Sequence, residues 1–250
     1  MVVKRNSPMA LEIGLNSARS GKLIVFEGVE GCGKTTQLRR LQQWLTDSGW
    51  LLRLGEATSV GQTRATREPG GTELGLGLRR LLLEVRPNMS ICERAELLLY
   101  AADRAQHVEE VLLPHLARGD IILCDRYTDS TIAYQGYGRG LSLSLIDQLN
   151  QIATKGLESD LTLWLDLDVK VGLTRKQQQN EITRMEQADL TFHSRVQQGF
   201  TALAKAHPNR IVRVDASLSQ ELVQEQIQII VNERLSQWYP TIGAGGLVGW

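Results

Sequence analysis

A glycine-rich segment between an apolar run and a helical pattern limits the folds open to this chain more than any other feature. Residues 28–35 read Gly-Val-Glu-Gly-Cys-Gly-Lys-Thr, which fits the pattern G-x-x-x-x-G-K-[ST]. Apolar residues 23–26 precede it, and Leu38, Leu41 and Leu45 place an apolar stripe on the segment that follows. A strand, a loop and a helix in this order are the context that the pattern requires, so a phosphate-binding loop is favoured over a chance glycine-rich turn.

The chemistry of this loop follows from its residue types. Glycines let successive backbone N–H groups turn inward as an anion nest, and the next helix directs its free N–H groups at the same point. Lys34 can reach the β- and γ-phosphates, and the Thr35 hydroxyl can ligate Mg²⁺. We therefore expect ATP with Mg²⁺ on the following residues: Gly28, Val29, Glu30, Gly31, Cys32, Gly33, Lys34, Thr35 and Thr36.

Composition excludes several other classes of protein. The chain has 250 residues, of which 42% are hydrophobic and 22% charged, as in ordinary globular proteins. Lys plus Arg equals Asp plus Glu at 28 each, which disfavours a polybasic binder of nucleic acid or membranes. The three cysteines, Cys32, Cys92 and Cys124, fit no metal or redox spacing and indicate a reducing compartment.

The two ends of the chain read as extensions of one domain, which we expect over residues 21–238. No apolar stretch approaches the roughly 20 residues that a membrane helix needs. Residues 1–20 lack the apolar core of a secretory signal, so we expect them to be disordered, or translation to begin at Met9. The glycine-rich segment 239–250 is expected to be a flexible tail. We expect a cytoplasmic location, with import into an organelle left open.

Short apolar runs alternate with helical patterns along this domain. The runs cover 23–27, 121–124, 161–167 and 211–214, with a less clear one at 51–54. The helical patterns cover 34–47, 141–154, 218–237 and, with a boundary at Pro114, 93–118. Continuous apolar runs indicate strands that are covered on both faces. The alternation predicts a three-layer α/β/α fold with a parallel five-stranded sheet, and residues 55–66 are expected to form an exposed loop without an assigned role.

Two further segments offer contacts for a second phosphate. Residues 66–72, Thr-Arg-Glu-Pro-Gly-Gly-Thr, form a Pro-Gly turn that presents Arg67 beside a carboxylate. The apolar run 121–124 leads into Asp125 and Arg126, and parallel sheets bind ligands beyond the carboxyl ends of their strands. Asp125 can orient a metal-bound water, and Arg126 can hold a phosphate in a fork geometry. The alternative is a structural ion pair between these two residues.

These contacts favour a small kinase among the proteins that carry such a loop. A GTPase should carry an Asn-Lys-x-Asp segment, which this chain lacks, and a motor or helicase would normally be longer. The second substrate of a kinase needs its own anion contacts, which Arg67 and Arg126 supply. Kinases for another pyrimidine nucleotide or a deoxynucleoside, and a non-catalytic nucleotide-dependent switch, stay open as alternatives.

Three segments resemble the signatures of the thymidylate kinase family: residues 27–36, 66–72 and 125–136. The third, Asp-Arg-Tyr-Thr-Asp-Ser-Thr-Ile-Ala-Tyr-Gln-Gly, is the most specific, and the likeness runs in order from about Lys22 to Ser217. The resemblance implies a bacterial-type enzyme with a mobile lid that transfers the γ-phosphoryl group of ATP to dTMP. It also implies Mg²⁺ as cofactor and a homodimer, for which the segment 93–118 could supply an isologous face.

The phosphate loop and the strand end already give Lys34, Asp125 and Arg126 as the expected catalytic residues and Thr35 and Asp125 as the expected metal ligands. The resemblance implies further roles for single residues. Glu30 would meet the 3′-OH of dTMP, Arg67 and Arg126 its phosphate. The base and sugar would contact Tyr100, Arg104, Ser130, Tyr134 and Gln135. Without the resemblance, Tyr100 would be interpreted as a core residue of an amphipathic helix.

The expected lid, residues 174–190, departs from the pattern of the family's bacterial branch, which is rich in arginine and ends in Asp-Arg-x-Glu. This chain keeps three of the charged residues: Arg175, Arg184 and Glu186. Gln177 and Gln179 stand where arginines are common in the family, and Thr183 stands in place of the aspartate. We predict Arg175 as the catalytic lid cation, with Lys176 and Arg184 as alternatives. Because such a cation contributes roughly 10³–10⁵ in rate, Arg175→Ala should lower turnover at least tenfold.

Overall fold

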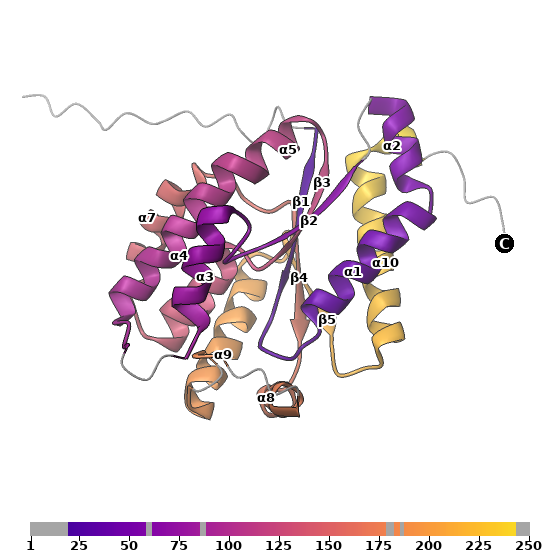
Figure 1. The fold of residues 1–250 in the computed structure, drawn as a ribbon. Helices are drawn as coiled ribbons and strands as arrows, with labels where there is room; N and C mark the ends of the chain where they lie inside the picture. The colour runs from indigo at the N-terminus through magenta and orange to yellow at the C-terminus, as the bar shows by residue number, and fades with distance from the viewer. Residues whose placement is uncertain (1–19, 59–61, 86–88, 179–182, 186–187, 244–250) are drawn as a thin grey trace, which may run out of the picture.

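A computed structural model describes residues 20–58, 62–85, 89–178, 183–185 and 188–243. Five parallel strands form one sheet with helices on both faces (Figure 1). The strands are β1 (Lys22–Glu27), β2 (Thr63–Arg67), β3 (Ile121–Asp125), β4 (Leu161–Asp166) and β5 (Ile211–Asp215), in the order β2-β3-β1-β4-β5. The predicted three-layer α/β/α fold with a five-stranded parallel sheet is confirmed.

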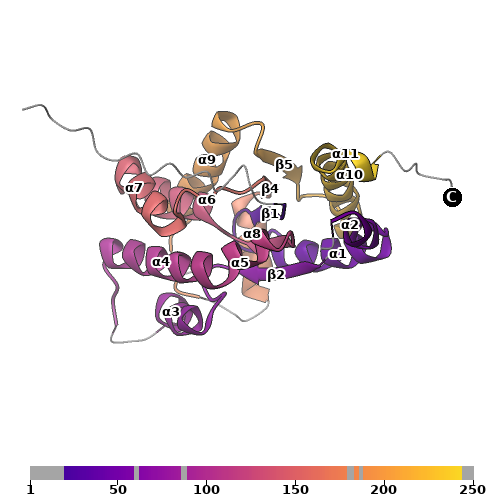
Figure 2. The same ribbon diagram turned by 90° about the horizontal axis from the view of Figure 1, so that it is seen from above.

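Two groups of helices enclose the sheet, and Figures 1 and 2 show them on its opposite sides. One group is α1 (Lys34–Asp47), α2 (Trp50–Thr58), α10 (Gln220–Trp238) and the short α11 (Pro240–Gly243). The other contains α3 (Glu73–Leu83), α4 (Glu93–His107), α5 (Leu113–Ala117) and α7 (Leu143–Thr154). The remaining helices are the π-helical η1 (Val108–Leu112) and η2 (Ile132–Gly138), with α6 (Thr128–Thr131), α8 (Val169–Gln178) and α9 (Leu190–Ala206).

The inner strands are buried on both faces, which explains their continuous apolar runs. All four residues from Leu23 to Phe26 are fully buried in β1, and Leu161 and Leu163 are fully buried in β4. On α1, Leu38, Leu41 and Leu45 are buried at the spacing of one helix face. The core therefore lies between the sheet and its two helical layers.

Two predictions for the region after α1 are wrong. Residues 51–54, expected to form a strand, lie in helix α2, where Trp50 and Leu54 share a buried face four residues apart. Residues 63–66, expected in an exposed loop, begin strand β2, which pairs with β3 at the edge of the sheet. β2 needs no apolar run because several of its side chains are exposed there.

The predicted helix 93–118 is a helical stretch with a change of winding before its proline. α4 leads into η1, where the backbone N–H of Leu113 bonds to the carbonyl of Val108, five residues back. Pro114 in α5 has no N–H to donate, and the wider turn precedes it. At the boundary expected at Pro114, the helix therefore changes its winding but does not end.

The expectations for the two ends of the chain concern mostly residues outside the described part, 1–19 and 244–250. Within the predicted tail, Pro240–Gly243 form the helix α11. The Tyr239 hydroxyl donates to the backbone carbonyl of Ser20 at 2.7 Å, which brings the two ends of the described chain together. In the described ranges, no helix combines the length and apolar character needed to cross a membrane.

Candidate active site

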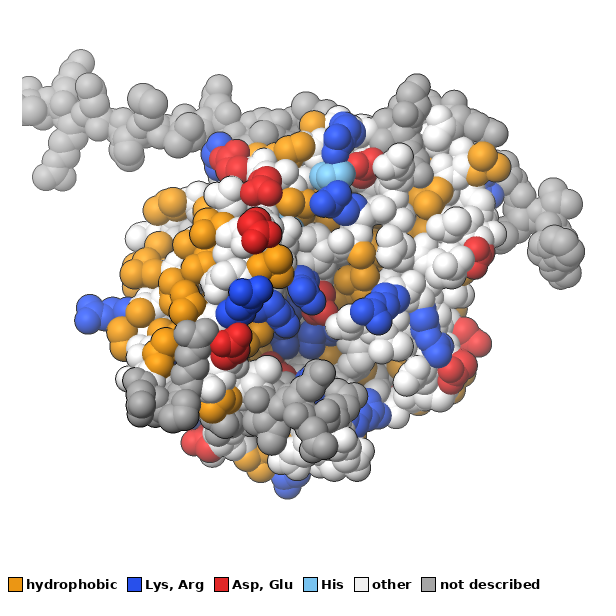
Figure 3. Space-filling view, viewed as in Figure 1, with side chains coloured by type: hydrophobic (Ala, Val, Ile, Leu, Met, Phe, Trp, Pro, Cys, Tyr) orange, Lys and Arg blue, Asp and Glu red, His pale blue; other side chains and the backbone are white. Residues whose placement is uncertain are grey.

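The three predicted phosphate-contacting segments meet at one cavity beyond the carboxyl ends of β1, β2 and β3. The cavity has a volume of about 680 Å³, within the range of small-molecule sites. Figure 3 shows Lys and Arg side chains gathered over this central hollow. Its lining includes these predicted site residues: Glu30, Gly31, Gly33, Lys34, Thr35, Thr36, Arg67, Tyr100, Arg104, Asp125, Arg126, Ser130, Tyr134 and Gln135. Four predicted site residues are not in the lining: Gly28, Val29, Cys32 and Arg175.

Glycines are required at two positions of the loop after β1. Gly28 has a φ of 141°, and a Cβ there would lie 2.5 Å from the carbonyl oxygen of Leu165. Gly31 has a φ of 71°, and a Cβ there would collide with the backbone of Gly172 in α8. The loop is therefore held between β4 and α8 by close backbone contacts that other residues would prevent.

Lys34, the first residue of α1, is buried and bends back across the loop. Its Nζ donates to the carbonyls of Gly28 at 3.1 Å and Val29 at 2.9 Å. These contacts hold an ammonium group inside the turn of the backbone. The N-terminus of α1 and this ammonium group together make the loop a site for anionic oxygens.

The two predicted metal ligands lie next to each other. The Thr35 hydroxyl donates to Oδ2 of Asp125 at 2.8 Å, which joins the start of α1 to the end of β3. A hydroxyl and a carboxylate fit Mg²⁺, which prefers oxygen ligands and usually takes one or two carboxylates plus substrate phosphates. In the described ranges, no larger cluster of His, Cys, Asp and Glu able to hold a metal occurs.

Arg126 crosses from the end of β3 to the phosphate loop. It takes the left-handed backbone conformation, with a φ of 72°. Its guanidinium group donates to the carbonyl of Gly28 at 3.1 Å, Ser130 Oγ at 3.0 Å and Glu30 Oε1 at 3.1 Å. Burial opposes its charge, but Tyr134 and Glu30 outweigh it and raise the pKa of Arg126. The strained backbone indicates that the position of this side chain matters.

Glu30 is held by a second group besides Arg126. The Tyr134 hydroxyl donates to both of its oxygens, at 2.7 and 2.8 Å. Burial tends to raise the pKa of Glu30, but Arg126 and Lys34 outweigh it and lower the pKa. Nδ1 of the buried His193 lies 3.7 Å from Glu30 Oε2, and within the described part of the chain neither nitrogen of His193 has a hydrogen-bond partner.

Arg79 is a site residue that the motifs missed. It lies on α3, lines the cavity and donates from Nη1 to the carbonyl of Pro69 at 2.9 Å. Burial and the neighbouring Arg67 lower the pKa of Arg79. The sequence feature that could have located Arg79 is Thr72, a typical helix-capping residue. Its hydroxyl accepts from the N–H of Gly75 and caps the start of α3. A helix starting there carries Arg79 back towards the turn that presents Arg67.

A buried polar network supports the turn after β2. Oε1 of Glu68 lies 2.8 Å from His107 Nδ1, and His107 Nε2 lies 2.7 Å from Thr66 Oγ1. Asp103 accepts from the backbone N–H of Gly70 at 2.9 Å. Burial, followed by the charge of Glu68, raises the pKa of Asp103 to about 6. These side chains of α4 fix the backbone that carries Arg67.

Tyr100 and Arg104 lie one turn apart on α4 and both line the cavity. Arg104 is buried with four bonds from its guanidinium group, to Glu68 Oε2, Thr131 Oγ1, Asn150 Oδ1 and the carbonyl of Tyr127. A guanidinium group has five N–H donors, so these contacts leave one for a ligand. A role for Arg104 at the base edge stays a prediction, and the described contacts give it a structural role as well.

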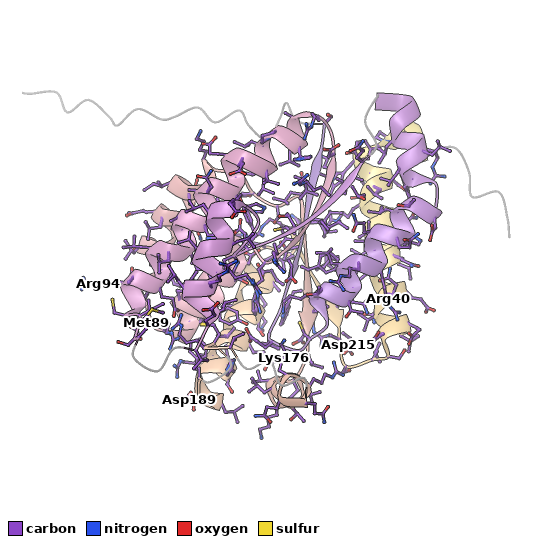
Figure 4. All side chains as sticks on the ribbon, in the orientation of Figure 1. Arg40, Met89, Arg94, Lys176, Asp189 and Asp215 are labelled. Carbon is purple, nitrogen blue, oxygen red and sulfur yellow. The ribbon has the colours of Figure 1, made fainter. Side chains whose placement is uncertain are left out.

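The lid residues divide between the cavity and the body of the protein. On α8, Lys176 lines the cavity whereas Arg175 is exposed and does not; Figure 4 shows Lys176 between α8 and the start of α1. Arg184 donates to the carbonyl of Leu82 at 2.9 Å and to Glu96 Oε2 at 2.5 Å, which anchors it to α3 and α4. The lid predictions for Gln179 and Glu186 lie outside the described residues.

The chain is similar to known thymidylate kinases. The family model described as thymidylate kinase matches residues 26–227. A thymidylate kinase of Cyanothece sp. is 60% identical over 229 residues, covering 89% of this chain and 98% of the relative. One from Nostoc punctiforme is 62% identical over 216 residues, covering 86% and 97%. The crystal structure of thymidylate kinase from Ehrlichia chaffeensis matches with a TM-score of 0.66 and 32% identity, covering 84% of this chain and 98% of that one. This chain belongs to the thymidylate kinase family.

Proposed function

We propose that this chain transfers the γ-phosphoryl group of ATP to dTMP, forming dTDP for the synthesis of dTTP. The observation that carries the proposal is one cavity lined both by the phosphate loop and by Arg67, Arg79 and Arg126. A loop that binds one nucleotide does not by itself need three further guanidinium groups. A second phosphate facing the first accounts for them, and family membership supports dTMP as its source.

The donor half of the reaction uses the loop and the start of α1. The phosphates of ATP lie against the backbone N–H groups of residues 28–36 and the ammonium group of Lys34. Thr35 and Asp125 are suited to hold Mg²⁺, which when bound supplies positive charge to the β- and γ-phosphates. Lys34 must exchange its carbonyl contacts at Gly28 and Val29 for phosphate oxygens.

The acceptor half lies across the cavity. Arg67, Arg79 and Arg126 hold the phosphate of dTMP, and Glu30 accepts from its 3′-OH. The ring of Tyr100 stacks on the base, while four further residues surround the base and sugar: Arg104, Ser130, Tyr134 and Gln135. The dTMP phosphate is an anion at neutral pH, so it attacks the γ-phosphorus in line without a strong general base. Catalysis is then positioning plus stabilisation of charge.

A lid cation completes the charge balance of the transition state. The lid begins on α8, and its cationic candidates there are Arg175 and Lys176. Lys176 lines the cavity, which favours it over Arg175 as the residue that reaches the transferring group. Arg184 instead anchors the lid through Glu96.

An acceptor panel tests the proposed function. The purified chain is incubated with ATP and Mg²⁺ together with dTMP, dUMP, dCMP or thymidine, and ADP is followed. We expect ADP with dTMP and none after chelation of Mg²⁺. ADP with thymidine alone would support a nucleoside kinase instead, and no ADP with any acceptor would support a nucleotide-dependent switch.

We also propose that two copies of the chain form a homodimer. Exposed apolar side chains gather over the helices at the left of Figure 3, which pack side by side. The exposed large apolar residues of these helices are Leu74, Leu76 and Leu81 on α3, Leu98 on α4, and Leu143, Leu145 and Ile152 on α7. An apolar surface of this kind supports an isologous interface. The free thiols of Cys32, Cys92 and Cys124 support a cytoplasmic location.

A further inference from the structure

Glu96 on α4 is a buried carboxylate behind the cavity wall, one turn before Tyr100. It is 1% exposed, and charged side chains are seldom buried so completely unless they are paired. Its oxygens accept from Gln135 Nε2 at 2.8 Å, from Nε and Nη2 of Arg139 at 3.5 Å, and from Nη2 of Arg184 at 2.5 Å. Glu96 does not line the cavity, so it can affect a ligand only through these partners.

The contact with Gln135 fixes which end of that amide faces the ligand. A carboxylate between two guanidinium groups accepts hydrogen bonds and donates none, whereas a glutamine amide carries an NH₂ donor and a carbonyl acceptor. The opposite orientation of the amide would put two acceptor oxygens about 2.8 Å apart. The NH₂ group therefore faces Glu96, and the carbonyl oxygen Oε1 is turned away from it.

The carbonyl of Gln135 is available to a ligand. Gln135 lines the cavity together with Tyr100 and Arg104. Among the hydrogen bonds of the described residues, none has Gln135 Oε1 as its acceptor. A ligand group that donates a hydrogen bond can therefore meet this oxygen, and a group that only accepts would be repelled.

We infer that Glu96 is a positioning residue that, through Gln135, selects acceptor bases with a hydrogen-bond donor at N3. Thymine and uracil carry N3–H, whereas cytosine has an unprotonated N3 beside its amino group. The inference rests on the proposed function, with the base of the acceptor nucleotide facing Gln135. The contact distinguishes dTMP from dCMP and is indifferent to the methyl group that separates dTMP from dUMP.

Glu96→Gln tests this inference because a neutral amide can accept from or donate to Gln135. With either orientation of the Gln135 amide allowed, its NH₂ group can face the base and donate a hydrogen bond to N3 of cytosine. We expect the ratio of kcat/KM for dTMP over dCMP to fall roughly tenfold or more, mainly through a higher KM for dTMP. The KM for ATP should stay unchanged. In a Gln135→Leu background, Glu96→Gln should not change the ratio further, since Glu96 acts through that amide.

Asp129→Asn is the matched control, because Asp129 is also a buried carboxylate paired with an arginine, Arg210. It should lower the Tm and leave the dTMP over dCMP ratio unchanged. A folded Glu96→Gln variant with the wild-type ratio would overturn the inference. If Glu96→Gln does not fold, Gln135→Leu alone must lose the preference, and a retained preference would overturn it equally. A wild-type chain inactive with dTMP would instead overturn the proposed function and this inference with it.

Discussion

Three guanidinium groups line the same cavity, those of Arg67, Arg79 and Arg126. Repulsion among their positive charges affects the pKa of Arg79. Burial and Arg67 lower the pKa of Arg79, so its charged form is held at some cost. A phosphate between these groups would offset both the repulsion and the burial. We therefore propose that Arg79 belongs to the acceptor site, although no sequence signature includes it.

Arg79→Gln should raise the KM for dTMP roughly tenfold to a hundredfold, because it removes a charge-assisted hydrogen bond to the phosphate. The KM for ATP should change little. Arg80→Gln is the control, since Arg80 follows on the same helix but is exposed. Steady-state kinetics with each substrate varied in turn measure both values. Equal effects of the two substitutions would remove Arg79 from the site.

Glu27, the last residue of β1, ties the phosphate loop to the segment that follows β3. Its carboxylate accepts from the backbone N–H groups of Tyr127 and Ser130, at 2.8 and 3.1 Å, and from Ser130 Oγ at 2.5 Å. These contacts fix the chain just after Arg126. Burial is the largest influence on Glu27 and raises its pKa from 4.5 to about 7.

Glu27 should make stability depend on pH between these two pKa values. In that range the folded state binds more protons at Glu27 than the unfolded state, so the free energy of unfolding falls as pH rises. Relative to Glu27→Gln, the wild type should lose up to about 3 kcal/mol between about pH 4 and pH 8. Urea unfolding of both proteins across this range measures the difference. A difference that does not vary with pH, as we expect for the exposed Glu225→Gln, would contradict the account.

At the scale of elements, the sequence predicts what is buried on both faces better than what lies at the edge. The runs that became β1, β3 and β4 are apolar because both faces of those strands are buried, whereas the edge strand β5 buries Ile211 and Val214 and exposes Arg213. β2 is polar and was missed, since its pairing with β3 depends on the sheet and not on its own residues. Residues 51–54 are apolar over too short a run to separate a strand from a helix face.

The same distinction applies to the candidate site. Lys34, Thr35 and Arg126 belong to motifs whose spacing determines their geometry, so the sequence suffices to locate them. Arg79 lines the cavity from α3, whereas Glu96 on α4 lies behind the cavity wall and contacts Gln135 in the lining. The cap at Thr72 marks where α3 begins, but local sequence patterns do not specify how α3 packs against α4, so the positions of these two residues follow from the fold.

A difference of one position along α8 decides which of two neighbouring cations of the lid lines the cavity. Arg175 and Lys176 are adjacent on α8, and they point in different directions because successive residues of a helix are about 100° apart. Lys176 is the one that lines the cavity. The choice of Arg175 depends on the family's preference for arginine and stays a prediction, and the place of Lys176 in the cavity lining leads us to propose Lys176 as the lid cation.

Lys176→Met should lower kcat roughly tenfold or more while ATP still binds, because a lid cation acts on the transferring phosphoryl group. Arg175→Met is the control and should have a smaller effect. Single-turnover kinetics and a separate ATP-binding measurement distinguish chemistry from binding. A larger loss in Arg175→Met would return the assignment to the residue that the sequence favoured.

At the scale of the whole molecule, apolar side chains are unevenly distributed over the surface. Leu98 on α4 is 56% exposed, on the helical layer that contains α3, α4 and α7. Leu52 on α2 is 69% exposed, but it lies on the helical layer across the sheet (Figure 1). A shared face on one side of the molecule is what a twofold-symmetric dimer requires.

Leu98→Glu should convert the proposed dimer to a monomer, because a charge buried without a partner opposes association. Leu52→Glu should leave the dimer intact, although Leu52 is the more exposed of the two. Sedimentation velocity over a range of concentrations measures both. A wild-type chain that is monomeric throughout, or a dimer unaffected by Leu98→Glu, would contradict the interface.

In the proposed reaction, the donor and acceptor phosphates lie end to end in the cavity, between the loop at Lys34 and the side chains of Arg67, Arg79 and Arg126. A ligand in which a chain of phosphates joins adenosine to thymidine would occupy both halves at once. The measurement is its inhibition pattern against each substrate. We predict competition with both ATP and dTMP, and tighter binding than either nucleotide shows alone. Competition with only one of the two substrates would contradict the claim.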